Sequence, residues 1–153
     1  MQKLDTKIPP VVVFIIAALL MWLVSKYTPA IDLPELVGWL MILAFLLFGA
    51  IMGLSGVFSF LKKETTVNPM DPEKATSLVD TGVYKISRNP MYLALALVLI
   101  AYSVYLKSLW SLIIVLLFMV YMTRFQIFPE ERAMIKQFGE EYTDYMERVR
   151  RWI

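Results

Sequence analysis

The sequence predicts an all-α membrane protein with four transmembrane helices and a C-terminal amphipathic helix on the cytosolic side. Hydrophobic residues make up 59 % of the 153 residues and the mean hydropathy is +0.63, whereas roughly half of an ordinary soluble domain is apolar. The hydrophobic residues also gather into long uncharged stretches, as expected for helices that cross about 30 Å of hydrocarbon. The chain length fits one membrane-embedded domain, residues 1–153.

Four uncharged stretches are the candidates for the spans: residues 8–25, 36–61, 89–106 and 108–123. Lys3 and Lys7 precede the first stretch as in a signal peptide, but no Ala-x-Ala cleavage site follows, so we expect a retained anchor. The fourth stretch is short, and Arg124 can extend it by snorkelling from its end. Only Lys107 and its neighbours separate the last two stretches, which predicts a tight antiparallel helical hairpin over residues 89–128.

The placement of positive charge predicts the orientation in the membrane. Thirteen of the fifteen Lys and Arg residues lie in the N-terminal tail, in residues 62–88, or from Arg124 onward. Lys26 and Lys107 alone lie in the connections on the opposite side. Because positive residues concentrate on the cytosolic side of membrane proteins, we expect both termini and the middle loop in the cytosol, with residues 1–61 forming the first two spans.

The predicted cytosolic loop, residues 62–88, is long for a connection between helices, which favours a function for it. Asp71-Pro72-Glu73 combines an N-cap residue, a first-turn proline and a first-turn acid, which predicts a short helix to about Val79. Asp80-Thr81-Gly82 then predicts a turn that leads to Tyr84.

Residues 129–153 are predicted to form the C-terminal amphipathic segment. Pro129-Glu130-Glu131 marks the start of a new helix, and we expect Gly139 to bend or end it. Apolar residues at helical spacing predict one face that packs against the membrane or the bundle. That face consists of Met134, Ile135, Phe138, Tyr142, Met146 and Val149. The end of the segment suits an anionic headgroup surface. Its residues are Arg148, Arg150, Arg151 and Trp152.

Composition limits the chemistry that the chain can perform. The sequence has no Cys and no His, which excludes disulfides, thiolate metal sites and the commonest general base near neutral pH. We therefore expect no metal site. The net charge of +2 gives no reason to expect nucleic acid as a partner. Gly49, Gly53 and Gly56 on the second span predict a face for close helix packing.

The first candidate site is the run from Arg88 to Tyr92. Asn89 as N-cap and Pro90 at the first helical position would start a helix on structural grounds alone. The functional alternative is an anion site, because free backbone N–H groups at a helix start attract anions and Arg88 would reinforce them. Tyr92 would then lie in or beside that site.

The second candidate site is the pair Glu130 and Glu131. Acids in a first helical turn complement the helix dipole, but at the membrane boundary at least one of them is expected to bind a cationic group. Arg124 could position an acidic acceptor, and snorkelling or pairing with a carboxylate would explain it equally well. Such a pocket suits a zwitterionic amino-acid group next to a sulfonium.

The residues of these two sites also occur in a familiar order. The run 81–93 (Thr-Gly-Val-Tyr-Lys-Ile-Ser-Arg-Asn-Pro-Met-Tyr-Leu) is followed by Pro129-Glu130-Glu131, residues 138–142 (Phe-Gly-Glu-Glu-Tyr), Tyr145 and residues 149–152 (Val-Arg-Arg-Trp). This combination resembles the integral-membrane methyltransferases, the group of isoprenylcysteine carboxyl methyltransferases and phospholipid methyltransferases. The resemblance covers roughly residues 65–153.

The resemblance implies S-adenosylmethionine bound from the cytosolic side and a lipophilic acceptor that enters from the bilayer. The acceptor would be a phospholipid amine, or a prenylcysteine-like carboxylate or thiol. Glu130 or Glu131 would bind the cofactor's ammonium or a ribose hydroxyl, and Tyr84 would close the pocket. The methionine end would be lined by Arg88, Asn89, Pro90 and Tyr92.

The sequence departs from the family pattern at two positions. The usual His is Asn89, which can still donate and accept hydrogen bonds but cannot take part in proton transfer. The Gly often found two residues after the motif's Tyr is Ala94. Two alternatives stay open: an NADPH-dependent membrane reductase similar to sterol reductases, and a non-enzymatic four-helix scaffold whose glycine face pairs with another protein.

Overall fold

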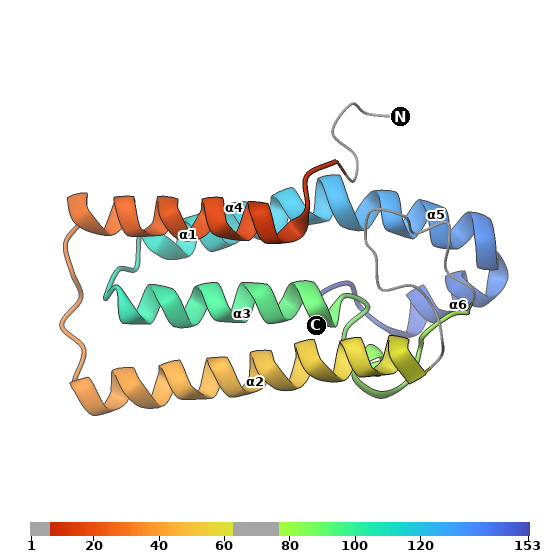
Figure 1. The fold of residues 1–153 in the computed structure, drawn as a ribbon, viewed down its shortest axis with the longest axis horizontal. Helices are drawn as coiled ribbons and strands as arrows, with labels where there is room; N and C mark the ends of the chain where they lie inside the picture. The colour runs from red at the N-terminus through yellow and green to blue at the C-terminus, as the bar shows by residue number, and fades with distance from the viewer. Residues whose placement is uncertain (1–6, 63–76) are drawn as a thin grey trace.

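The computed structural model describes residues 7–62 and 77–153, and these residues form helices joined by short connections (Figure 1). The elements in chain order are α1 (Pro10–Tyr27), α2 (Glu35–Lys62), the 3-10 turn η2 (Gly82–Lys85), α3 (Pro90–Tyr105), α4 (Ser111–Met122), the π-helical turn η3 (Thr123–Ile127), α5 (Phe128–Phe138) and α6 (Glu140–Arg148). The predicted all-α fold is therefore confirmed for the described residues.

The predicted loop helix is wrong at its end. Most of it, from Asp71 onward, lies outside the described residues, but Leu78 and Val79 are described and are not helical. Both side chains are buried in a cluster with Tyr142 and Tyr145 of α6. The packing of this segment against α6 thus takes the place of the predicted helical turn.

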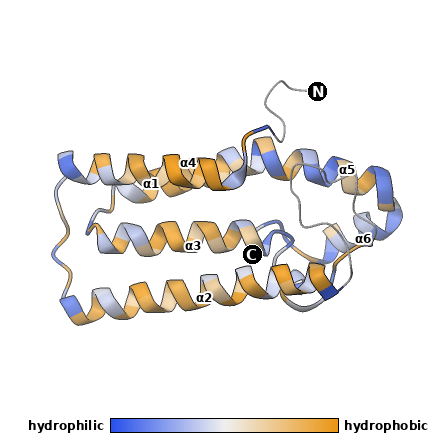
Figure 2. Ribbon diagram, viewed as in Figure 1, coloured by the Kyte–Doolittle hydropathy of each residue, from blue (hydrophilic) through white to orange (hydrophobic). Residues whose placement is uncertain are grey.

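Three helices of the described chain are long and apolar enough to cross a membrane: Pro10–Tyr27, Glu35–Lys62 and Ser111–Phe138. α3 is apolar but has 16 residues, or about 24 Å of helix, which is less than the ~30 Å of a hydrocarbon core. Figure 2 shows hydrophobic residues over α1–α4 and mostly hydrophilic residues over α5 and α6. This division is typical of an integral membrane protein with a polar end.

The helix that follows the fourth apolar stretch does not restart at Pro129. The chain stays helical from Ser111 to Phe138 and passes through the π-helical turn η3 just before Pro129. Proline has no N–H group and its ring displaces the carbonyl four residues earlier, and a wider turn accommodates such a change within one helix. Gly139 ends α5 with φ 54°, so the predicted break at this glycine is confirmed.

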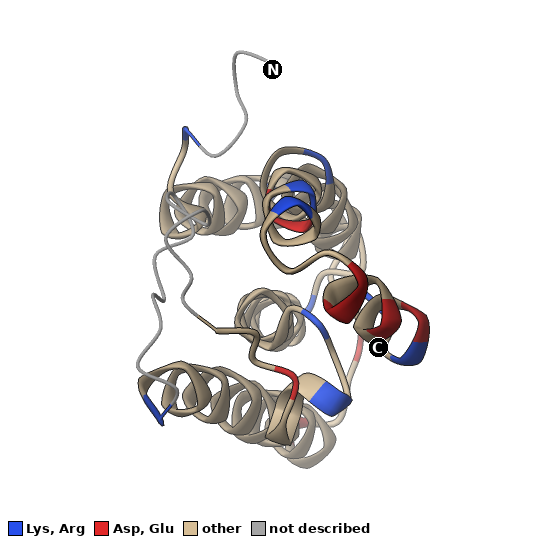
Figure 3. Cartoon of the chain, turned by 90° about the vertical axis from the view of Figure 1, so that its right-hand side faces the viewer, with Lys and Arg blue, Asp and Glu red and all other residues tan. Residues whose placement is uncertain are grey.

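The glycines of α2 form a face for close helix packing, as predicted, and the structure gives α3 as the partner of this face. A Cβ atom on Gly53 would lie 3.1 Å from Cβ of Ala94, and one on Gly56 would lie 3.2 Å from Cγ of Met91. Seen from the polar end, α3 lies between α2 on one side and α1 with α4 on the other (Figure 3). The absence of side chains at these glycines therefore brings α2 close to the start of α3.

The apolar face predicted for the C-terminal segment packs against the chain itself. Tyr142, Tyr145 and Val149 are buried, and Met134, Phe138 and Met146 pack against the same cluster. Ile135 of the predicted face is instead exposed. Of the two expected partners, membrane or bundle, this face contacts the bundle.

Candidate functional site

A cavity of about 730 Å³ extends from the polar end of the bundle along α2 and α3. Its apolar part is a groove whose residues come from three helices: Pro10 and Val11 of α1, Leu46, Ala50, Leu54 and Val57 of α2, and Met91, Leu95 and Val98 of α3. Its polar part is lined by residues that precede or begin α3 and by residues of α5 and α6. The cavity therefore joins an apolar groove to a polar, charged end.

Six of the eight residues expected to bind a cofactor or substrate line this cavity. They are Tyr84, Arg88, Asn89, Tyr92, Glu130 and Glu131. The other two lie outside the lining. Pro90 packs against α2, where a Cβ atom on Gly56 would lie 3.3 Å from its Cγ. The guanidinium of Arg124 lies 5.6 Å from the ring centre of Phe125.

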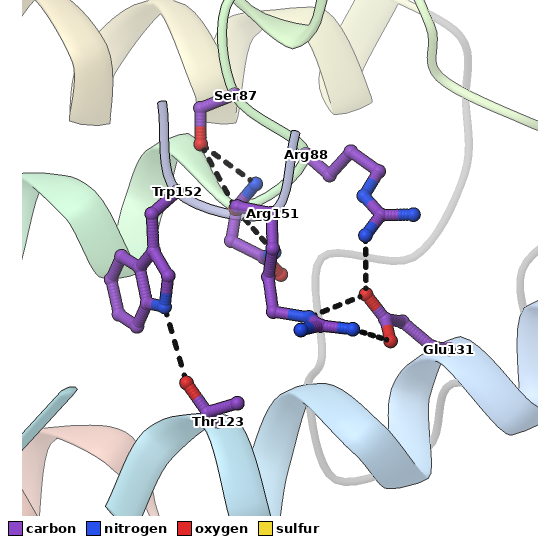
Figure 4. Close-up of polar contacts among 7 residues, drawn as sticks. Ser87, Arg88, Thr123, Glu131, Arg151 and Trp152 are labelled. Atoms are coloured by element: carbon purple, nitrogen blue, oxygen red, sulfur yellow. Dashed lines mark hydrogen bonds and ion pairs between the residues drawn. The ribbon is translucent and has the colours of Figure 1, made fainter. Parts of the chain in front are cut away.

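Glu131 is held by two arginines at the polar end (Figure 4). Arg151 binds both carboxylate oxygens, with Nε 2.9 Å from Oε1 and Nη2 2.8 Å from Oε2. Arg88 reaches Oε1 through Nη2 at 3.0 Å. Bidentate contacts of this kind are the stronger form of charge-assisted hydrogen bond, and the contact with Glu131 raises the pKa of Arg151. The carboxylate of Glu131 is therefore committed to contacts within the chain.

Arg88 has unused hydrogen-bonding capacity inside the cavity. Its side chain is 7 % exposed, and neither Nε nor Nη1 has a hydrogen-bond partner among the described residues. Buried donors without partners are costly, more so when they carry charge. An anionic ligand in the cavity could accept a hydrogen bond from either nitrogen.

The chain after α6 returns to the start of α3. The N–H of Arg88 donates to the carbonyl of Arg150 at 3.1 Å, and Nδ2 of Asn89 donates to the carbonyl of Arg151 at 2.9 Å. Nε1 of Trp152 donates to Oγ1 of Thr123 at 3.1 Å. Arg151 and Trp152 thus make contacts within the protein, which corrects the expectation that they belong to a headgroup-binding surface.

The same contacts change the role expected of Asn89. Asn89 precedes α3 and Pro90 is its first residue, as predicted, but the Asn89 side chain makes no cap hydrogen bond. Its amide group instead donates a hydrogen bond to the carbonyl of Arg151. The N–H of Asn89 donates to Oγ of Ser87 at 3.1 Å, so the backbone before α3 is bonded locally rather than bare.

Tyrosines supply most of the remaining polar groups of the cavity. The hydroxyl of Tyr92 donates a short hydrogen bond to Oε1 of Glu130, and the hydroxyl of Tyr145 donates to the carbonyl of Tyr84 at 2.7 Å. Burial raises the pKa values of Tyr84, Tyr142 and Tyr145. These phenols therefore stay protonated and neutral at physiological pH.

Sequence reasoning missed three residues of this site. Tyr142 and Tyr145 line the cavity, and Arg151 holds Glu131. All three belong to the C-terminal pattern that carries the family resemblance, so the pattern itself was the available signal. The opposite charges of Glu131 and Arg151 did not identify them as a pair, because several other Lys and Arg residues lie nearer to Glu131 in the sequence.

Comparison with known proteins gives two matches. A family model described as phospholipid methyltransferase matches residues 37–141, which include all eight residues expected to bind a cofactor or substrate. A protein of Haemophilus influenzae named only as uncharacterized is 38 % identical over 63 residues, which are 41 % of this chain and the whole of that protein.

Proposed function

Because the chain belongs to the phospholipid methyltransferase family, we propose that it transfers a methyl group from S-adenosylmethionine to a lipophilic acceptor at the cytosolic face of a membrane. One observation carries the proposal: Arg88 presents two buried nitrogens that have no partner among residues 7–62 and 77–153, at the polar end of a cavity that continues as an apolar groove. The polar end suits a charged cofactor, and the groove suits an acceptor that is dissolved in the bilayer.

The residues present fit S-adenosylmethionine. Its carboxylate can accept from one of the two Arg88 nitrogens that have no partner among the described residues, and its ammonium matches Glu130, whose described partner is the neutral hydroxyl of Tyr92. Glu131 is held by two arginines, so we assign it to holding Arg88 rather than to the ammonium. A cavity of about 730 Å³ lies within the usual range for cofactor sites, roughly 300–1,000 Å³.

The cofactor, when bound, supplies a methyl group that its sulfonium already activates. The chain's own residues therefore have to align the two reactants and exclude water. Tyr84 and Tyr142 line the polar end with neutral side chains. Asn89 binds the carbonyl of Arg151 and so fixes the backbone next to Arg88 to the C-terminal segment. A charged amine acceptor must also lose a proton, and Glu130, which lines the cavity and has no ion pair with the residues that the structure describes, could take it.

The groove points to the class of acceptor. Aliphatic side chains of α1, α2 and α3 line it, among them Val11, Leu54 and Leu95. A chain of methylene groups that moves from the bilayer into this groove stays in apolar surroundings, whereas a polar acceptor would lose hydration there. The acceptor in this proposal is therefore a lipid or a lipid-modified group with an amine, carboxylate or thiol. Arg124 lies outside the lining, so Arg88 is the cation of the site.

The proposal includes four spans with both termini in the cytosol. α3 would cross as a short fourth span beside three longer ones, and the excess of Lys and Arg beside the polar end favours the cytosolic side for it. The cavity then opens where a water-soluble cofactor is available.

Specific contacts disfavour the two alternatives. The phosphates of NADPH need several cations, but Arg151 at the polar end is already paired with Glu131. A scaffold that uses its glycine face for another protein needs that face free, and Gly53 and Gly56 are instead packed against α3. The NADPH alternative would still appear as an outcome of the following experiment.

The test is to incubate purified protein with radiolabelled S-adenosylmethionine and total membrane lipid extract and to identify the labelled product. We expect label in a lipid fraction, and we expect S-adenosylhomocysteine to raise the melting temperature of the protein. Arg88→Met should abolish both effects, whereas Lys85→Met, a change at an exposed neighbour, should leave both intact. Stabilisation by NADPH alone, with no labelled lipid, would overturn the proposal.

A further inference from the structure

The segment after α6 is fixed in place on two sides. Its backbone accepts hydrogen bonds from the N–H of Arg88 and the side chain of Asn89 at the start of α3. Trp152 is bound to Thr123 in η3 on the opposite side. Arg151 lies between these anchors, so its side chain is directed at Glu131 by the backbone on both sides of it (Figure 4).

Arg151 uses most of the hydrogen-bonding capacity of the Glu131 carboxylate. It takes both carboxylate oxygens at 2.8 and 2.9 Å, and its guanidinium also lies over the ring of Phe128 at 4.8 Å. Arg88 contacts the same carboxylate through Nη2 alone. A planar guanidinium and a carboxylate otherwise prefer a two-bond contact with each other.

This sharing of one carboxylate accounts for the one-bond contact of Arg88, which leaves Nε and Nη1 without a partner in the described part of the chain. If Arg151 were absent, Glu131 would lose one of the two arginines that the structure pairs with it, and Arg88 could turn to bind both oxygens. This two-bond contact would use Nη2 and one of the two nitrogens that now lack a described partner, and the positive charge of Arg88 would be paired with Glu131 alone. The cavity would then offer a ligand anion a guanidinium whose charge is already neutralised, although Arg88 itself remained.

We propose that Arg151 is a positioning residue of the anion site: by binding both oxygens of Glu131, it keeps Arg88 available for the carboxylate of the ligand. The inference rests on the proposed function, because it takes that ligand to be the amino-acid end of the methyl donor. Arg151 does not line the cavity and acts through Glu131.

Two probes separate positioning from general stability. S-adenosylhomocysteine carries the amino-acid carboxylate, whereas 5′-methylthioadenosine shares the nucleoside and the thioether but has no carboxylate. We expect Arg151→Met to weaken S-adenosylhomocysteine binding at least about tenfold, as for a lost charge-assisted contact, and to leave methylthioadenosine binding within about twofold. Arg150→Met is the matched control, because the side chain of Arg150 is exposed and only its carbonyl contacts Arg88.

A second variant gives a result that a merely structural role would not produce. In the Arg151→Met background, Glu131→Gln removes the charge that would capture Arg88, so S-adenosylhomocysteine affinity should recover by at least about threefold. Arg151→Lys keeps one charge without the two-bond geometry and should fall between Arg151→Met and the unmodified protein.

The affinities would be measured by titration calorimetry on the full chain in detergent. Equal loss of both probes in Arg151→Met, or a further loss on adding Glu131→Gln, would overturn the positioning role and leave the proposed function standing. Failure of the unmodified protein to bind S-adenosylhomocysteine at all would overturn the proposed function and this inference with it.

Discussion

Tyr92 in the first turn of α3 donates a hydrogen bond to Glu130 in the first turn of α5. The two residues are 38 positions apart in the chain and both line the cavity. This contact joins the two helix segments whose sequences predicted an anion site and a cation site.

The Tyr92 hydroxyl is the first group to test. Tyr92→Phe removes the described partner of Glu130 while keeping the ring, so we expect a three- to tenfold loss of kcat/KM, consistent with about 1 kcal/mol for one hydrogen bond. Glu130→Gln should have a larger effect on cofactor affinity because it removes the carboxyl group that would pair with the ammonium. Tyr105→Phe, at an exposed tyrosine, is the control. Unchanged kinetics in Tyr92→Phe would show that the contact has no role in binding.

The apolar groove is expected to select the acceptor and not the cofactor. Ala50 lines the groove, and Ala50→Leu should lower turnover of the lipid acceptor at least about tenfold by filling it. The affinity for S-adenosylhomocysteine, measured by calorimetry, should stay within about twofold. Leu47→Trp changes an exposed position of the same helix and should leave both quantities unchanged. A parallel loss of both in Ala50→Leu would contradict separate subsites.

The glycine face should be sensitive to small increases in size. Gly53→Ala places a Cβ atom 3.1 Å from Cβ of Ala94, and overpacking of this kind costs about 1–3 kcal/mol. We expect a lower melting temperature in detergent, and Ala94→Gly in the same chain should restore part of it. Gly38→Ala is the control, because its Cβ would be 3.4 Å from a leucine side chain. No recovery in the double variant would mean that Ala94 is not the limiting contact.

The indole of Trp152 should contribute through its hydrogen bond to Thr123. Trp152→Phe and Thr123→Val each remove one partner, and we expect each to lower the free energy of unfolding by about 1 kcal/mol. Since both changes remove the same contact, the double variant should lose less than the sum. Denaturation in mixed micelles would measure this. Strict additivity would show that the two side chains act independently.

Local sequence signals were sufficient for the helices. Pro10 and Pro90 begin α1 and α3, Gly139 ends α5, and long uncharged stretches became apolar helices. The helix ends depend on the backbone preferences of proline and glycine, which act over a few positions. The apolar helices depend on the continuous hydrophobic composition of their stretches. Close packing through the glycines of α2 could also be predicted, because small residues at helical spacing have few other uses in a membrane, but their spacing did not identify α3 as the partner.

The contacts that build the site could not be predicted from local sequence signals. Nothing local to Asn89 indicates that its side chain would leave the helix start and bind the carbonyl of Arg151, 62 positions away. Pro129 carries the usual signal for a helix start, yet the preceding π-helical turn lets the helix continue. In each case a tertiary contact or a neighbouring turn outweighed the local preference, and one sequence alone does not show which contact forms.

The polar end of the cavity is made almost entirely of contacts between distant parts of the chain. Its hydrogen bonds join positions that are 20, 38, 61 and 62 residues apart. Loop closure costs entropy before such contacts form, and membrane helices form individually before they associate. We therefore expect the apolar helices to be in place before the site exists, and a fragment that stops after α5 to insert into a bilayer without any capacity to bind the methyl donor.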